Sequence, residues 1–128
     1  MTKNKKTINS NKIAKKISQL MLEKKAVDIK LINLNKITTL TDYFIICTSE
    51  SEPQTRAIFN HIKDELANDN IKPWKTEGYE HLQWVIMDYI NFVVHVFNKE
   101  TREYYNFERF YHLVLILFVN SMDLYLLL

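Results

Sequence analysis

The sequence predicts an α/β (α+β) fold in which a mixed β-sheet is flanked by helices. Apolar residues recur at helical spacing in two segments, and elsewhere they alternate with polar residues or run continuously, as in strands. The predicted order helix, strand, strand, helix, strand, strand, helix suits helices packed against one sheet. The chain has 128 residues, of which 47% are hydrophobic and 25% charged, and this size and mix indicate one globular domain.

The first predicted helix begins at Ser10, which can act as its N-cap, and runs to about Lys25. Its apolar stripe consists of Ile13, Ile17, Leu20 and Met21. Residues 1–9 precede it as a basic, flexible arm. A half-buried strand should follow, in which Val27, Ile29 and Leu31 alternate with polar residues.

The middle of the chain predicts a buried strand and a capped helix. The continuous apolar run 43–47 is typical of a strand buried on both faces, with Cys47 as a small buried hydrophobe. Ser51 and Gln54 form a capping box at the start of the next helix, which should end at residues 68–70. The buried stripe of this helix is expected to be Ile58, Ile62 and Leu66.

Residues 84–89 and 92–97 predict a β-hairpin in which Ile86 faces His95 and Met87 faces Val94. The turn contains Ile90 and Asn91, which is unusual because two-residue turns favour glycine or asparagine at positive φ. A last short helix is expected at 106–110, capped by Asn106.

Charge is distributed unevenly along the chain. Residues 1–25 contain eight lysines and one acid, giving +7, whereas the remaining nine basic and fourteen acidic residues give −5. The basic end could contact a polyanion such as RNA, or its lysines could simply solvate a helix, while the acidic body would suit a basic protein. No apolar segment typical of a secretory signal follows the first lysines, which favours a cytoplasmic setting.

The composition argues against several kinds of chemistry. The chain has 1 glycine, too few for a phosphate-binding loop, and 1 cysteine, too few for a disulfide framework or a multi-cysteine zinc site. The four histidines are scattered, so we expect no metal site and no cofactor. The apolar run 113–119 is too short to span a membrane, and we expect it to extend the core or mediate self-association.

An ordered set of short motifs spans residues 26–110. The set comprises Ala26-Val27-Asp28-Ile29, Leu40 to Cys47, Glu77-Gly78, Trp84, Asp88, Val94-His95-Val96-Phe97 and Thr101 to Arg109. In this order and spacing the motifs resemble the ribosomal silencing factor family, also called the Iojap family. The chain departs from the family pattern at residues 49–53, at the Ile90-Asn91 turn, at residues 110–111 and in the tail.

The resemblance implies a fold similar to that of nucleotidyltransferases. It also implies a function: family members bind the large ribosomal subunit through its fourteenth protein, block joining of the small subunit, and so lower translation when nutrients are short. Members of the family form homodimers. The corresponding division of this chain is a basic arm at 1–9, a ribosomal silencing factor domain at 10–111 and an apolar extension at 112–128.

An enzymatic alternative is a small nucleotidyltransferase, which would need paired metal-binding carboxylates. Asp42 and Asp88 each lack an aspartate two residues away, and Gly-Ser does not occur, so the sequence favours a protein without catalytic residues. A second alternative is a general RNA-binding module that uses the N-terminal lysines.

The candidate partner-binding residues match the family pattern and combine charge with aromatic surface. They are Glu77, Gly78, Trp84, Asp88, His95, Arg102 and Tyr105. Trp84 could equally be a core residue. Asp88 and His95 could share a sheet face, which would permit acid–base chemistry but more often serves to order the histidine.

Overall fold

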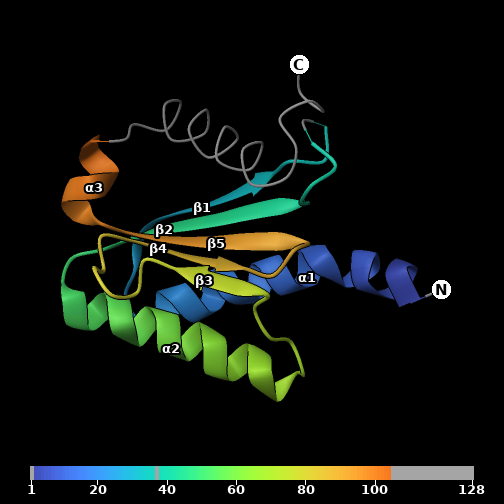
Figure 1. Ribbon diagram of the computed structural model, residues 1–128, viewed down its shortest axis with the longest axis horizontal. Helices are drawn as coiled ribbons and strands as arrows, with labels where there is room; N and C mark the ends of the chain where they lie inside the picture. Colours follow the sequence, from blue (N-terminus) through green and yellow to red (C-terminus); the bar gives the residue numbers. More distant parts are fainter. Residues whose placement is uncertain (1, 37, 105–128) are drawn as a thin grey trace.

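The computed structural model describes residues 2–36 and 38–104. Its elements follow one another as α1 (Thr2–Glu23), β1 (Val27–Asn33), β2 (Tyr43–Ser49), α2 (Glu52–Asn68), β3 (Lys75–Glu77), β4 (Trp84–Asp88), β5 (Phe92–Asn98) and α3 (Lys99–Tyr104). The five strands form one sheet in the order β1-β2-β5-β4-β3 (Figure 1). Strands β2 and β5 are parallel and the other neighbours are antiparallel, so the predicted mixed sheet is confirmed.

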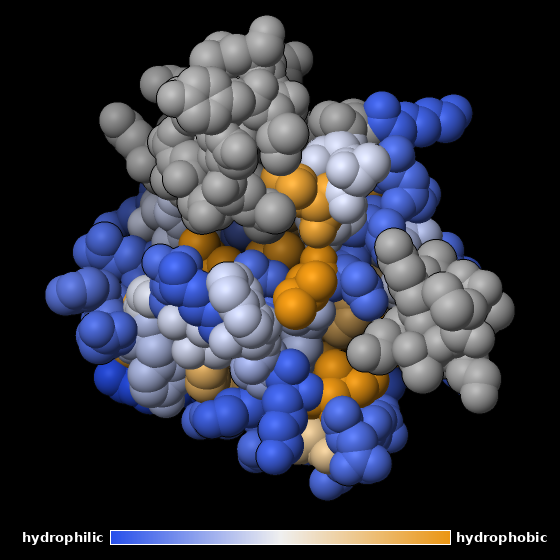
Figure 2. Space-filling model, turned by 45° about the vertical axis from the view of Figure 1, so that its right-hand side comes forward, coloured by the Kyte–Doolittle hydropathy of each residue, from blue (hydrophilic) through white to orange (hydrophobic). Residues whose placement is uncertain are grey.

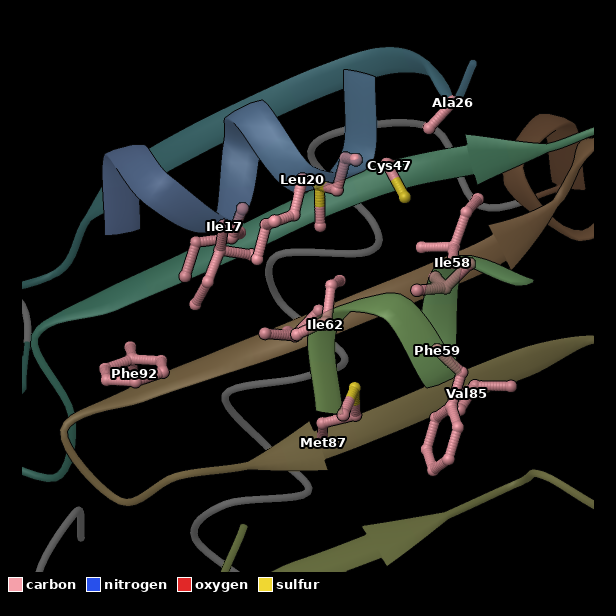
Figure 3. Close-up of a cluster of buried hydrophobic side chains, with 14 of the residues drawn as sticks. Ile17, Leu20, Ala26, Cys47, Ile58, Phe59, Ile62, Val85, Met87 and Phe92 are labelled. Atoms are coloured by element: carbon pink, nitrogen blue, oxygen red, sulfur yellow. The ribbon is translucent and has the colours of Figure 1, made fainter. Parts of the chain in front are cut away.

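Helices α1 and α2 cover the same face of the sheet (Figure 1). Their apolar stripes meet strands β2, β4 and β5 in the main core, where Ile17 of α1 and Ile62 of α2 are fully buried. Figure 3 shows these side chains together with Cys47 of β2 and Met87 of β4 in the layer between helices and sheet. The predicted helical stripes therefore form the contact surface of both helices.

The opposite face of the sheet carries a second, smaller cluster. Its buried members are Leu34, Phe44, Ile46, Val93 and Phe97. Because successive side chains of a strand point to opposite faces, β2 and β5 supply residues to both clusters. Both strands are almost completely buried, as the continuous apolar run of β2 predicts.

The start of α2 combines two contacts. The amide of Gln54 donates to Ser51 Oγ over 3.1 Å, which confirms Ser51 as the N-cap. The Gln54 side chain accepts from the backbone N–H of Glu50 over 2.7 Å, one residue before the cap, and donates to the carbonyls of Lys24 and Lys25 at the end of α1. One glutamine thus joins the beginning of α2 to the end of α1.

Several expectations require correction. Helix α1 begins at Thr2, so Ser10 lies inside it, buried, and is not an N-cap. An irregularity between Val27 and Lys30 shifts the β1 register, so Val27 pairs with Thr48 on one face while Leu31 pairs with Ile45 on the other. Strand β3 and helix α3 were not expected. The predicted helix 106–110 and the apolar run 113–119 lie outside the described residues.

Candidate functional site

The face of the sheet turned away from α1 and α2 gathers most of the candidate residues. The strand register confirms that Ile86 pairs with His95 and Met87 with Val94. The same register pairs Trp84 with Phe97 and Asp88 with Val93, and it pairs Glu77 of β3 with Ile86. Directly paired residues share a face, so one face of the sheet, which we call the aromatic face, includes Phe44, Glu77, Trp84, Asp88, His95 and Phe97. Phe44, His95 and Phe97 are buried in it, whereas Trp84 and Asp88 are partly exposed and Glu77 is exposed.

Trp84 is partly buried and begins β4 at one end of the aromatic face. Its indole stacks on the Phe97 ring with centroids 5.0 Å apart and an interplanar angle of 21°. Its Nε1–H donates to Nδ1 of His95 over 3.1 Å. The side chain is therefore both a packing residue and part of a surface, which combines the two roles that the sequence left open.

The surroundings of His95 determine both its protonation and its tautomer. It is 1% exposed, and the Phe44 ring meets it edge-on with centroids 4.8 Å apart. Burial lowers the pKa of His95 to about 3, so the ring is neutral at physiological pH. Because Nδ1 accepts from Trp84, the proton of the neutral ring must be on Nε2.

Asp88 lies at the end of β4, on the same face as His95, as expected. Its Oδ1 accepts from the backbone N–H of Ile90 over 2.8 Å, which fixes the carboxylate at the start of the turn. No hydrogen bond joins Asp88 to His95 within the described residues, and the histidine is ordered by Trp84 instead. Burial raises the pKa of Asp88, opposed by the Ile90 hydrogen bond and by Lys75.

Gly78 lies against the backbone of Trp84, in the connection that precedes β4. It adopts φ +84°, and a Cβ added there would lie 2.0 Å from the backbone oxygen of Trp84. Its carbonyl accepts from the amides of His81 and Leu82 in the connection to β4. Glycine is therefore required for the close approach that positions Trp84.

Arg102 of α3 reaches the end of the aromatic face. Its guanidinium donates to Thr48 Oγ1 over 2.9 Å and to the backbone carbonyl of Asp28, where β1 is irregular, over 3.2 Å. It also lies 5.9 Å from the centroid of the Phe97 ring, within cation–π range. These contacts tie α3 to β1, β2 and β5.

The two remaining candidate residues are Glu77 and Tyr105. Glu77 is exposed at the end of β3, where its carboxylate lies 3.5 Å from Lys75 Nζ. Tyr105 lies outside the described residues. The sequence pattern does not mark Phe44, Thr48 or Phe97 as site residues, although Phe97 belongs to the Val94–Phe97 motif and lies on the same face of its strand as His95.

The geometry of these residues suits binding of a partner better than it suits acid–base catalysis. The buried, neutral histidine is a weak base, and its protonated form is scarcely populated near neutral pH, because its pKa is about 3. Among residues 2–36 and 38–104, no three His, Cys, Asp or Glu side chains converge in a way that could hold a metal ion. Within the same ranges no helix has the length and apolar character needed to cross a membrane.

Solved structures share this α+β architecture. A crystal structure of a protein from Chromobacterium violaceum superimposes with a TM-score of 0.71 at 29% identity, over 74% of this chain and 79% of that one. A crystal structure from Bacillus halodurans gives a TM-score of 0.67 at 35% identity, over 74% of this chain and 90% of that one. The protein is thus a small α+β domain of the class that these structures represent.

Comparison of the sequence with known proteins narrows the class further than the fold does. The chain is 37% identical over 102 residues to the ribosomal silencing factor of Bacillus subtilis, covering 80% of this chain and 86% of that protein. It is 39% identical over 87 residues to that of Halalkalibacterium halodurans, covering 68% and 74%. The family profile described as "Ribosomal silencing factor during starvation" matches residues 7–123. The chain belongs to this family, and the match extends beyond residues 26–110 at both ends.

Proposed function

We propose that the protein is a non-enzymatic translation repressor that docks on the large ribosomal subunit through its fourteenth protein. Bound there, it sterically blocks joining of the small subunit and lowers translation when nutrients are limiting. The proposal rests on membership of the silencing factor family and on one structural observation. Trp84, Asp88 and His95 lie on one sheet face, where an aromatic side chain and a carboxylate are held in fixed positions.

The chemistry of this face supports a basic protein as the partner. Hot spots of protein interfaces often combine a partly buried aromatic anchor with a charged rim, and Trp84 with Asp88 and Glu77 supplies both. The −5 charge of residues 26–128 would speed association with a basic surface and orient it. A stable contact would cover about 800 Å² on each partner.

The other parts of the proposal follow the family resemblance. We propose that the protein acts in the cytoplasm and forms a homodimer, without a membrane partner, and that the lysine-rich N-terminus can touch ribosomal RNA. The division into residues 1–9, 10–111 and 112–128 remains a prediction.

The nucleotidyltransferase alternative receives little support from the geometry. Asp88 uses Oδ1 to accept from a backbone amide, and Asp42 lies at the start of β2, bonded through its backbone to Asn91. A magnesium-dependent nucleotide titration distinguishes the two functions. Tight, magnesium-dependent binding would favour the enzyme.

A binding measurement with purified large subunits tests the proposed function. Asp88→Asn removes the charge but keeps an oxygen that can accept from Ile90 N–H, so it isolates the electrostatic contribution. We expect it to weaken binding about tenfold, a typical loss for an interfacial charge pair. Asp64→Asn, on the exposed side of α2, is the matched control and should bind like the wild type.

Deletion of residues 1–9 separates the proposal from general RNA binding. A silencing factor that docks through the aromatic face should keep most of its affinity for the large subunit after this deletion. An RNA-binding module would lose it, and the affinity of the intact chain for naked RNA would fall steeply with salt.

A further inference from the structure

Helix α1 has a strongly one-sided charge. It contains six lysines and one acid, Glu23, which is its last residue. Its first turn holds no acid, and Lys3, Lys5 and Lys6 lie near the positive end of the helix dipole. This arrangement works against helix formation, because acids near the N-terminus and pairs of opposite charge along the helix would stabilise it better. The excess of lysine therefore points to a role outside the fold.

The outward side of α1 is polar and contains no acid over residues 11–19. Ala14 and Ile17 are fully buried against the sheet, whereas the exposed residues in this stretch are Asn11, Lys12, Lys15 and Gln19. Residues three apart are neighbours on a helix, so Lys12 and Lys15 lie on the same side. We call these two residues the lysine surface.

The charge of the lysine surface is not neutralised by the described part of the chain. Lys16 forms an ion pair with Asp69, just beyond the end of α2, but neither Lys12 nor Lys15 forms an ion pair with a described residue. Glu23 is eight residues beyond Lys15, which is about 12 Å along the helix axis. The two ammonium groups are therefore available to an external anion.

The lysine surface lies near the end of the sheet at which β4 turns into β5. Asn11, which precedes Lys12, donates from Nδ2 to the hydroxyl of Tyr43 over 2.9 Å, and Tyr43 at the start of β2 pairs with Phe92 at the start of β5. Helix α1 extends past this end of the sheet on the right of Figure 1. Figure 2 turns the same end forward, and hydrophilic residues predominate on its coloured surface. Asp88 ends β4 at this end, on the face turned away from α1.

RNA suits the lysine surface better than a membrane does. A helix that lies on a membrane inserts its apolar side, and the apolar stripe of α1 is buried against the sheet. Phosphates of an RNA backbone accept lysine as a point charge and require no apolar contact. A ribosomal subunit exposes such phosphates beside basic proteins, so a basic helix and a separate acidic face match the two components of one partner.

We propose that Lys12 and Lys15 bind backbone phosphates of ribosomal RNA beside the ribosomal protein that the aromatic face contacts. The inference rests on the proposed function and deepens it, because it places an RNA contact on the outward side of α1, beyond residues 1–9. Contacts to phosphates carry no base specificity and serve to position a protein. The lysine surface therefore orients the protein on the subunit, while the aromatic face recognises the ribosomal protein.

The test measures how salt affects binding of the full chain to purified large subunits. The double variant Lys12→Gln, Lys15→Gln removes two charges and keeps long polar side chains at exposed positions. Its plot of log binding constant against log salt should be shallower by about 1.5–2, and its affinity in about 0.1 M salt should fall about tenfold. Lys63→Gln, Lys72→Gln also removes two exposed charges and is the matched control, with a slope expected within about 0.5 of the wild type.

Urea unfolding of the same proteins separates binding from folding. Lys12 lies three residues before Lys15 and four before Lys16, at spacings where like charges repel. The double variant should therefore keep the wild-type urea midpoint or exceed it slightly. Weakened binding together with a lowered midpoint would assign the loss to folding and overturn the inference.

The binding outcomes distinguish this inference from the proposed function. If the wild type and the double variant bind large subunits with the same affinity and salt slope, the lysine surface is refuted and the proposed function stands. A wild type that does not bind would overturn both. An equal effect of the control variant would show a general dependence on net charge and contradict the lysine surface. Weakened binding to phosphatidylserine vesicles, with subunit binding intact, would assign the lysines to a membrane instead.

Discussion

The indole Nε1–H of Trp84 donates to Nδ1 of His95 over 3.1 Å, across the two strands of the hairpin. This contact fixes the orientation of the indole on the aromatic face and the proton of the neutral histidine on Nε2. The sequence offers His95 as a candidate acid or base, whereas the structure shows that it holds the indole of Trp84 in place. The same relationship makes His95 sensitive to substitution and to acid.

Removing either partner of this hydrogen bond should destabilise the fold. We expect Trp84→Phe and His95→Phe each to lower the free energy of unfolding by about 1–3 kcal/mol, because each leaves a largely buried polar group without this partner. The double variant should lose less than the sum of the two, with a coupling energy of about 1 kcal/mol. Urea unfolding of the four proteins measures this cycle, and strictly additive losses would contradict the coupling.

The stability of the protein should fall with acid because of His95. Its pKa is about 3 in the folded chain and about 6.5 when unfolded, so the unfolded state binds the proton more readily between these values. The stabilisation of the neutral ring is complete above about pH 6.5 and declines by about 1.4 kcal/mol for each pH unit below it. His95→Gln, which does not titrate, should lack this decline between about pH 6.5 and pH 5, as urea unfolding can measure.

Gly78→Ala should be strongly destabilising. The added Cβ would lie 2.0 Å from the backbone oxygen of Trp84, and alanine is strained at φ +84°. We expect a loss of at least about 2 kcal/mol, measured as a lower midpoint of thermal or urea unfolding. Wild-type stability in this variant would mean that Gly78 does not hold the connection before β4 in the way described.

Arg102→Lys should weaken the attachment of α3 to the sheet. Lysine cannot reproduce the forked guanidinium that donates both to Thr48 and to the Asp28 carbonyl. The expected loss is about 1 kcal/mol by urea unfolding, because hydrogen bonds from a partly exposed charged group contribute modestly. Arg56→Lys, at an exposed position of α2, is the matched control and should change stability by less than about 0.5 kcal/mol.

Much of the fold could be predicted because local patterns and tertiary packing agree. The stripe of Ile58, Ile62 and Leu66, the cap at Ser51 and the pairing of Ile86 with His95 all follow from spacing alone. Strand β3 could not be predicted because its three residues, Lys75 to Glu77, are polar and exposed at an edge of the sheet. Its backbone pairing with β4 defines the strand, and no alternation of apolar and polar residues marks it. The register shift in β1 depends on Asp28 at φ +50°, which alternation does not reveal.

The residues of the candidate site could be predicted from the sequence, but the contacts between their side chains could not. The motifs selected Trp84, Asp88 and His95, and the hairpin register placed them on one face. The partner of His95 could not be deduced, because Asp88 and Trp84 are both near neighbours in the sheet, and only the structure distinguishes their contacts. Gly78 and Arg102 were chosen as contact residues, and their observed interactions are with the chain itself.

Sedimentation of mixed ribosomal subunits, with and without the protein, tests the central claim most directly. Saturating protein should move with the large-subunit fraction and reduce the share of joined particles. Asp88→Asn should be less effective at the same concentration, whereas Asp64→Asn should act like the wild type. An undiminished share of joined particles, with large subunits fully occupied by the protein, would contradict the steric block on subunit joining.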